Sequence, residues 1–233
     1  LRPISDLLPG GVLDGEAVQA PTSSKRQLDR RNLRRASALL DEAGWDVGDD
    51  GMRRNADGET LKVEILNDSQ AFDRVINPYI ENLRALGVDA VHTRIDNAQM
   101  TERERNFDFD MVTGNFPTQL TPGSELEQYF GSESAEFSIF NLAGYGTEAA
   151  DRLIANVKAA QTRSDLDDAI RALDRVLRAG KFWVPQWFRN IHTVAYYDMY
   201  RYPDVLPPYA LGTLDFWWLD QQAHDSLKAA GAF

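Results

Sequence analysis

The sequence predicts an α/β fold, with a mixed β-sheet flanked by helices. Alternation at Leu61–Leu66 and an apolar segment at Val88–Ile95 predict two strands, and the residues between them repeat apolar side chains at helical spacing. A strand, a helix and a strand in so short a span form a right-handed βαβ unit, so the two strands should be parallel. The 233 residues are enough for one large domain or two small ones.

The charge and composition exclude several classes of protein. The net charge of -11 argues against nucleic-acid binding and disfavours an anionic membrane surface as a partner. The absence of cysteine excludes disulfides and thiolate metal sites. No apolar run approaches the length of a membrane span. The chain starts with Leu1 instead of Met, so we expect a segment of a longer protein that lacks any signal peptide.

The first helix and the turns after it are the most informative local pattern. Asn32–Trp45 carries apolar residues on one helical face, and Gly44 is placed to end the helix. Two turns rich in Gly and Asp follow, which predicts a hairpin before the strand at Leu61–Leu66. Residues 1–29 are rich in Pro, Gly and Ser and are expected to form an extended arm or linker.

The middle of the chain predicts two further helices and a third strand. Phe72–Leu86 is strongly amphipathic, and Pro78 inside it should either kink the helix or restart it near Asn77. A short helix at Ala98–Arg105 then leads to a strand at Phe109–Thr113.

The C-terminal third predicts two helices followed by strands. Thr147 and Ser164 are expected to be N-caps, because periodic apolar residues follow each of them. Trp183–Phe188 and Ile191–Tyr197 are expected to be strands, and a short helix should close the chain. The expected division is an arm (residues 1–29), an α/β lobe (residues 30–198) and a returning tail (residues 199–233).

Residues with catalytic potential are sparse. The three histidines are scattered, and the motifs of nucleophilic, nucleotide-binding and metal-binding sites are absent, so we expect no metal and no cofactor. Asp108 and Asp110, or Glu125 and Glu127, are paired carboxylates, which leaves a hydrolase as an alternative. A ligand-free interaction module of the same fold is another. No Lys, Arg or His lies between Arg105 and Arg152, and such a span favours cationic ligands if its loops line one rim.

Several segments together carry a resemblance to a known family. Asn32–Trp45, Glu81–Val88, Arg105–Met111, Val184–Trp187 and Trp217–Asp220 resemble, in order, segments of the family 5 extracellular solute-binding proteins of ABC importers, the oligopeptide- and dipeptide-binding group. The last two of these segments are most similar to the Yej-type subgroup, which serves an importer of peptides and peptide-like antibiotics.

The resemblance implies a fold, a function and a location. The family fold has two lobes that close over a ligand, and this chain resembles the C-terminal, periplasmic-binding-protein type II-like lobe with its returning tail. It implies a periplasmic receptor of Gram-negative bacteria, monomeric and without enzymatic activity. Such a receptor captures small peptides or peptide-like solutes in the cleft between the lobes and delivers them to ABC permease subunits at the inner membrane.

The resemblance also suggests which residues line the cleft. They lie before the long helix, after the third strand, in the loop around residues 141–145 and in the turn around residues 186–190: Phe72, Arg74, Asn115, Phe116, Thr118, Gln119, Asn141, Tyr145, Gln186, Trp187 and Arg189. Oligopeptide-binding relatives place an aspartate in the loop after the third strand, where it holds the ligand amine. The corresponding loop here, Gly114–Gln119, has no carboxylate.

Overall fold

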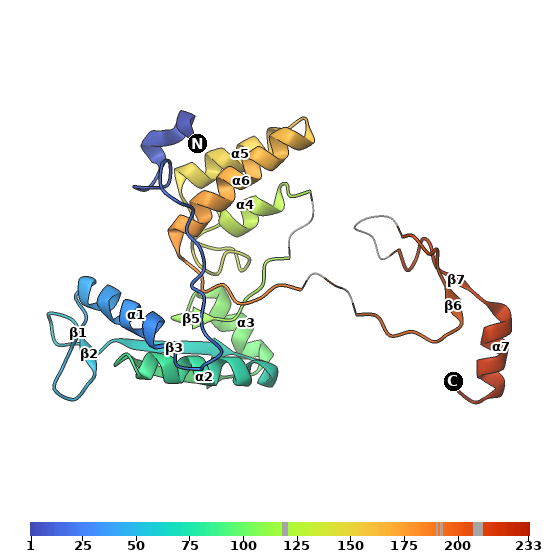
Figure 1. Cartoon of the computed structure of the whole chain (residues 1–233), viewed down its shortest axis with the longest axis horizontal. Helices are drawn as coiled ribbons and strands as arrows, with labels where there is room; N and C mark the ends of the chain where they lie inside the picture. The colour runs from blue at the N-terminus through green and yellow to red at the C-terminus, as the bar shows by residue number, and fades with distance from the viewer. Residues whose placement is uncertain (118–120, 190, 192, 207–211) are drawn as a thin grey trace. The chain divides into compact units, whose positions relative to one another are not determined.

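The computed structural model describes residues 1–117, 121–189, 191, 193–206 and 212–233. They form two compact units, Leu1–Val184 and Pro185–Phe233. Most elements of the first unit are labelled in Figure 1. In chain order they are η1 (Arg2–Leu7), α1 (Arg30–Glu42), β1 (Asp46–Val47), β2 (Arg53–Arg54), β3 (Lys62–Asn67), η2 (Gln70–Phe72), α2 (Asp73–Arg84), β4 (Asp89–Arg94), α3 (Asn97–Arg105), β5 (Met111–Val112), α4 (Glu125–Phe130), α5 (Glu148–Ala159) and α6 (Arg163–Gly180). The second unit holds β6 (Tyr200–Arg201), β7 (Trp218–Leu219) and α7 (Gln221–Ala229).

The predicted βαβ unit is confirmed, and it forms the main sheet of the first unit. β3 pairs in parallel with β4 on one side and with β5 on the other, in the order β4-β3-β5. Ile65 lies opposite both His92 and Met111 in the register. Antiparallel pairs also occur, in two separate small sheets, β1-β2 and β6-β7. The α/β class predicted from the sequence is therefore that of the structure.

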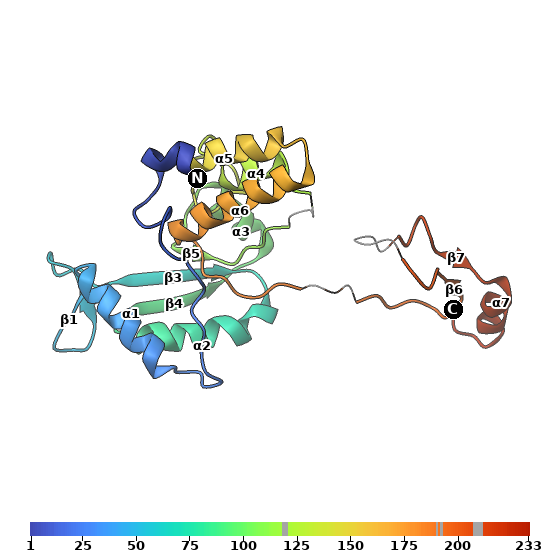
Figure 2. The ribbon, with the colours of Figure 1, turned by 45° about the horizontal axis from the view of Figure 1, so that its top comes forward.

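One face of the main sheet is covered by α1 and α2 (Figure 2). Ile65 and Ala90 of the sheet pack with Ile76 and Ile80 of α2, and all four side chains are buried. Leu40 of α1 packs against the same core. Burial of these apolar faces stabilises the βαβ unit by about 25 cal/mol for each Å² removed from water.

The predicted helix-to-hairpin segment is also confirmed. Gly44 has φ +82°, a left-handed conformation that favours glycine, and it follows Ala43, the C-cap of α1. The Trp45 N–H donates to the Leu40 carbonyl, which closes the end of the helix at 2.9 Å. Val47 then pairs with Arg53 in the hairpin β1-β2. Pro78 does not interrupt α2, which is assigned as helix from Asp73 to Arg84.

A second core lies among η1, α4, α5 and α6. Ile4 and Val12 are buried in it beside Leu153 and Leu173, although residues 1–29 were expected to form an extended arm. Arg175 donates to the Val12 carbonyl and so holds the N-terminal segment to α6. The apolar side chains of this N-terminal segment are sufficient to pack it against the second core, despite its Pro and Gly content.

Three local predictions are corrected by the structure. Thr147 caps α5 as expected, but Thr162, not Ser164, caps α6, since its Oγ1 accepts the Asp165 N–H at 3.1 Å. The third strand contains only Met111 and Val112 of the five residues expected. The described residues of Trp183–Phe188 and Ile191–Tyr197 form no strand, because none of them has a neighbouring strand with which to pair its backbone.

In the second unit, Tyr200 and Arg201 pair with Leu219 and Trp218, and Asp220 caps the predicted final helix, α7. No helix in the described ranges is both long enough and apolar enough to cross a membrane.

Candidate functional site

The carboxyl edge of the parallel sheet brings two of the predicted loops to the same end of the first unit. β3 and β5 are parallel neighbours, with Leu66 opposite Val112, so the segments that follow them leave the sheet side by side. The first segment leads through η2 to Phe72, and the second leads to Asn115 and Phe116. In open α/β sheets this edge is where ligands bind.

Asn67 ties these two segments together. Its side chain has no exposed area and lies at the end of β3. The Nδ2 group donates to the Ser69 carbonyl at 2.7 Å, and Oδ1 accepts from the Ser69 N–H at 3.2 Å and from Thr113 Oγ1 at 3.4 Å. Asn67 was not among the residues singled out from the sequence. A polar residue that ends an apolar strand was the available signal.

The end of β4 is fixed at this edge by a charged contact. Arg94, the last residue of β4, places Nη1 2.7 Å from Oδ2 of Asp73 at the start of α2. Arg74, the next residue, is exposed and belongs to the first turn of α2. Phe72 is half-buried against the core beneath α2. The structure therefore presents the Arg74 guanidinium to solvent and holds the Phe72 ring against the protein.

Phe116 and Tyr145 belong to one cluster of aromatic rings. The Phe116 ring centroid lies 5.5 Å from that of Phe130 and 4.5 Å from that of Trp183. Tyr145 stacks on Phe182 at 4.2 Å, and Phe182 in turn lies 6.1 Å from Phe130. Asn115, directly before Phe116, is exposed. Two candidates that are 29 positions apart in the printed sequence thus share one apolar surface, which favours contact with apolar ligand groups.

Asn141, which was expected to contact the ligand, is instead buried inside its own loop. Its side chain is 1% exposed. Nδ2 donates to the Tyr145 carbonyl at 2.7 Å and to Ser134 Oγ at 3.1 Å, while Oδ1 accepts the Tyr145 N–H at 3.1 Å. The amide is used by the loop itself, because a buried polar group must be hydrogen-bonded. Asn141 therefore positions Tyr145.

The remaining candidates fall outside the described residues or belong to the second unit. Thr118 and Gln119 lie outside the described residues. Gln186, Trp187 and Arg189 belong to the second unit and are exposed, with Trp187 62% exposed.

The paired carboxylates noted in the sequence all have structural partners. Asp108 Oδ2 lies 3.0 Å from Arg103 Nε, and Asp110 Oδ2 accepts the Glu64 N–H at 2.8 Å. Glu125 accepts the Gly123 N–H at 3.0 Å, and Glu127 pairs with Lys158 at 2.6 Å. The same Arg103 donates to Glu64 and thereby lowers the pKa of the Glu64 carboxyl.

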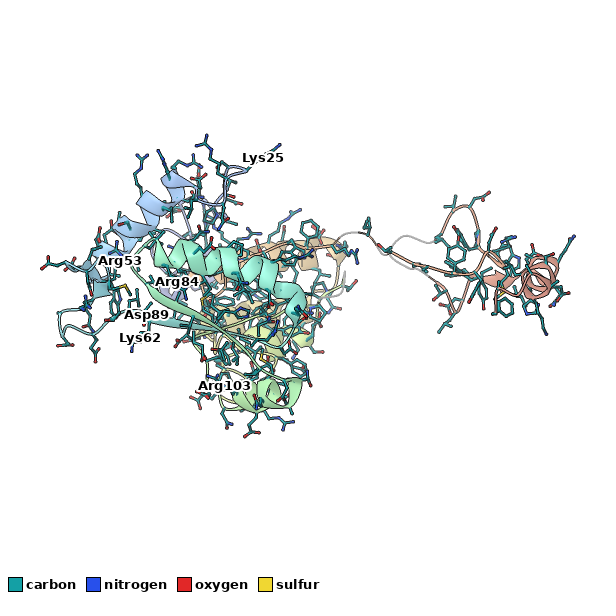
Figure 3. All side chains as sticks on the ribbon, turned by 90° about the horizontal axis from the view of Figure 1, so that it is seen from below. Lys25, Arg53, Lys62, Arg84, Asp89 and Arg103 are labelled. Atoms are coloured by element: carbon teal, nitrogen blue, oxygen red, sulfur yellow. The ribbon has the colours of Figure 1, made fainter. Side chains whose placement is uncertain are left out.

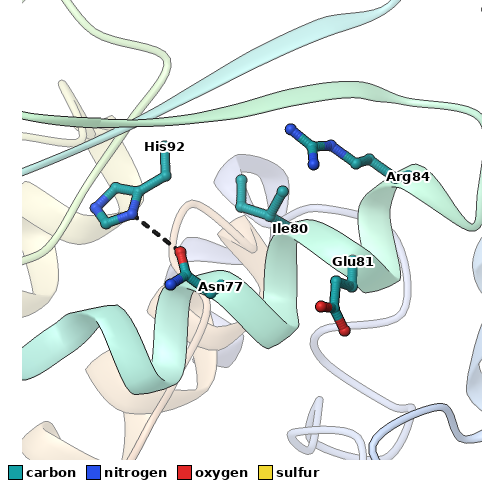
Figure 4. A pocket seen from close by; sticks show the side chains of 5 residues that line it. All are labelled: Asn77, Ile80, Glu81, Arg84 and His92. Carbon is teal, nitrogen blue, oxygen red and sulfur yellow. Dashed lines mark hydrogen bonds between the residues drawn. The ribbon is translucent and has the colours of Figure 1, made fainter.

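A polar depression lies along β4, between that strand and α2 (Figure 4). It is lined by Asn77, Ile80, Glu81, Arg84 and His92. His92 Nδ1 lies 3.2 Å from Asn77 Oδ1, and His92 Nε2 lies 3.9 Å from Asp73 Oδ1. Across the described part of the chain, no group of three or more His, Asp or Glu side chains is arranged to hold a metal ion.

Comparison with known proteins identifies what the chain resembles. The family model described as bacterial extracellular solute-binding proteins, family 5 Middle, matches residues 4–137. Over 219 residues the chain is 36% identical to YejA of Agrobacterium fabrum, named as a probable peptide-binding protein, and the match covers 94% of this chain and 36% of that protein. The chain thus spans about a third of the length of the curated relatives it matches.

Two solved structures share the fold. A periplasmic oligopeptide-binding protein of Thermotoga maritima with bound mannohexaose is similar with a TM-score of 0.60 and 20% identity, over 67% of this chain and 31% of that one. AppA, an oligopeptide-binding protein of Bacillus subtilis in complex with a nonapeptide, is similar with a TM-score of 0.59 and 19% identity, over 89% of this chain and 44% of that one.

Proposed function

The chain belongs to the family 5 bacterial extracellular solute-binding proteins, and we propose that it is one lobe of a receptor for peptides or peptide-like solutes. The receptor captures its ligand in the periplasm between two lobes and delivers it to the permease subunits of an ABC importer. It works as a monomer and does not turn the ligand over. A peptide ligand is supported by the name of the Agrobacterium relative and by the fold shared with oligopeptide-binding proteins.

One observation carries the proposal. Buried Asn67 holds together the segments that follow β3 and β5, so that exposed Arg74 and Asn115 are both presented at the carboxyl edge of the sheet. Binding by closure needs such a preformed half-site, since a ligand that contacts both lobes shifts the population toward the closed state.

The candidate residues then have distinct roles. Asn115 hydrogen-bonds to the ligand backbone, and Arg74 pairs with a ligand carboxylate, which its planar guanidinium can bind with two parallel hydrogen bonds. Phe116, Tyr145 and Phe72 supply apolar contact, and Asn141 acts through Tyr145. Thr118 and Gln119 continue the Asn115 loop and are proposed with it. Gln186, Trp187 and Arg189 stay sequence-based candidates on which the proposal does not depend.

A hydrolase is not proposed. Asp108, Asp110 and Glu127 each have a separate partner in a hydrogen bond or ion pair. A general acid–base pair needs two carboxyl groups directed at one substrate, whereas each of these carboxylates is paired with a different group of the protein.

The test is made on the intact receptor, purified from its host without refolding. Native mass spectrometry should show short peptides or peptide-like solutes that copurify with it. Calorimetry with such a ligand should give a Kd at least about tenfold weaker for Asn115→Ala and for Arg74→Ala, which corresponds to about 1.4 kcal/mol. Arg105→Ala is the matched control, since Arg105 is an exposed arginine at the far end of α3. A receptor that is empty and has no affinity for a peptide library would contradict the proposal.

A further inference from the structure

The start of α1 carries a dense group of cations in an otherwise acidic chain. Residues 25–35 contain six, Lys25, Arg26, Arg30, Arg31, Arg34 and Arg35, and all six are exposed. Lys25 extends from the protein beside the first turn of α1 (Figure 3). We call these six residues the basic face. Within the part of the chain that the structure describes, none of them forms an ion pair.

The one acid within residues 25–35, Asp29, does not neutralise the basic face. As the N-cap of α1 its carboxylate accepts the backbone N–H groups of Ser24, Arg31 and Asn32 at 2.9, 3.0 and 3.1 Å. These hydrogen bonds engage the Asp29 carboxylate at the N-terminus of α1, where it satisfies backbone N–H groups that have no partner within the helix. The guanidinium groups nearby are left to solvent.

The fold gains nothing from cations at this end of α1. The first turn of a helix has a partial positive charge and favours Asp or Glu, but the first turn of α1 holds Arg30 and Arg31 and no acid. The arginines of α6 differ, because Arg163 and Arg178 each pair with an aspartate four residues away, both at 2.8 Å. The unpaired arginines of α1 therefore indicate a binding role.

The shape of the basic face fits a flat anionic surface. Arg31, Arg34 and Arg35 recur at helical spacing on the side of α1 away from Leu40, which packs against the core, and Arg30 lies on the flank of the helix. Two apolar side chains are exposed at its borders, Leu28 at 46% and Leu39 at 52%. Membrane-surface helices combine Lys and Arg on a polar side with Leu that enters the boundary between headgroups and acyl chains, and here the two exposed leucines offer a small apolar contact of that kind.

We propose that the basic face of α1 is a docking surface for the anionic headgroups of a phospholipid bilayer. Five of its six cations are arginines, whose planar guanidinium binds phosphate with two parallel hydrogen bonds. Leu28 and Leu39 add a shallow apolar contact at its borders. The exposed leucines favour a lipid surface over an acidic protein loop, which would leave them without an apolar environment.

The net charge of -11 does not prevent this docking. Salt screens charges beyond about 8 Å at physiological ionic strength, so the charges nearest the bilayer decide the interaction. Each Lys or Arg at an anionic surface strengthens binding several-fold. The interaction should therefore depend steeply on salt. The inference does not rest on the proposed transport function.

The experiment is cosedimentation of the full chain with vesicles of about one part phosphatidylglycerol to three parts phosphatidylcholine, and with vesicles of phosphatidylcholine alone. The chain should sediment with the anionic vesicles at low salt and not with the neutral ones. The triple variant R31Q/R34Q/R35Q should reduce the partition coefficient on the order of 100-fold. Glutamine keeps a good helix propensity, and circular dichroism checks that α1 is intact.

The matched control is R163Q/R171Q/R178Q, which removes the same charge from paired arginines on the outer side of α6. It should keep the partition coefficient within about threefold of the unchanged chain, because α6 does not contact the bilayer. Equal losses in the two triple variants, or equal binding to neutral vesicles, would overturn the proposal. So would no binding to anionic vesicles at low salt, which would assign the basic face to an acidic protein surface.

Discussion

Replacing Arg53 by methionine should lower the free energy of unfolding of the first unit by about 3–5 kcal/mol. Arg53 lies in β2 and is only 1% exposed. Its guanidinium joins three segments: Nε donates to the Leu86 carbonyl at 2.7 Å, Nη1 to Asp41 Oδ1 at 2.6 Å, and Nη2 to Ser37 Oγ at 2.6 Å. Nη1 also donates to the Trp45 carbonyl.

The magnitude follows from what each partner loses. Methionine fills much of the same volume but donates no hydrogen bond, so the carbonyls of Leu86 and Trp45 lose their donor, at a cost of about 1–3 kcal/mol each. Asp41 is 53% exposed and returns to water at little cost. The two carbonyls therefore account for most of the expected loss.

The measurement is urea unfolding of the full chain, with the slope of the transition checked to be unchanged. The neighbouring variant Arg54→Met is the control, since Arg54 pairs with Asp50 at the surface and such pairs contribute less than about 1 kcal/mol. If Arg53→Met costs no more than Arg54→Met, the buried guanidinium does not join these segments as described, and the reasoning is refuted.

Two further predictions concern the sheet. Asn67→Ala should lower the free energy of unfolding, measured with urea, by about 1–3 kcal/mol, because the two loop segments lose the side chain that joins them. The same change should weaken ligand binding by the intact receptor, and unchanged affinity in calorimetry would contradict this. The Glu64 pKa is lowered chiefly by the Arg103 hydrogen bond. The ionised Glu64 side chain therefore contributes fully to the stability of the fold above the ordinary glutamate pKa of about 4.3, and this contribution is lost as the pH falls through the lower pKa of the folded state. Glu64→Gln should therefore reduce the stability at neutral pH by about 1–2 kcal/mol and reduce the loss of stability on acidification; thermal unfolding followed from neutral to acid pH checks it, and equally steep loss in both proteins would count against it.

Much of the fold could be predicted because the patterns that encode it are local. The periodicity of α2, the apolar strands on either side of it and the glycine after α1 each act within a few residues, and all were read correctly. The caps show the limit of this approach. Ser164 is the better N-cap by residue type, but the structure selects Thr162 because α6 begins two residues earlier than the periodicity indicated.

The candidate site was predicted less completely than the fold. The resemblance directed attention to Asn115 and Phe116, which lie on the segment that follows β5 at the carboxyl edge of the sheet. Asn141, however, resembled a ligand contact, and only the packing of the loop around it reveals a side chain that is fully used within the protein. Hydrogen bonds between residues distant in sequence leave no local pattern.

The sequence by itself determined the α/β class, the family and the order of α1, the hairpin, the βαβ unit, α3, α5 and α6, because periodicity, turn residues and family motifs are properties of neighbouring residues. Only the tertiary structure decided which polar side chains are buried, since burial depends on which segments, distant in the sequence, pack around each side chain. Arg53 and Arg54 are adjacent and chemically identical, yet one lies between α1 and the end of α2 while the other faces solvent. The described residues of Trp183–Phe188 and Ile191–Tyr197 form no strand for the same reason, because a strand exists only where another strand lies beside it.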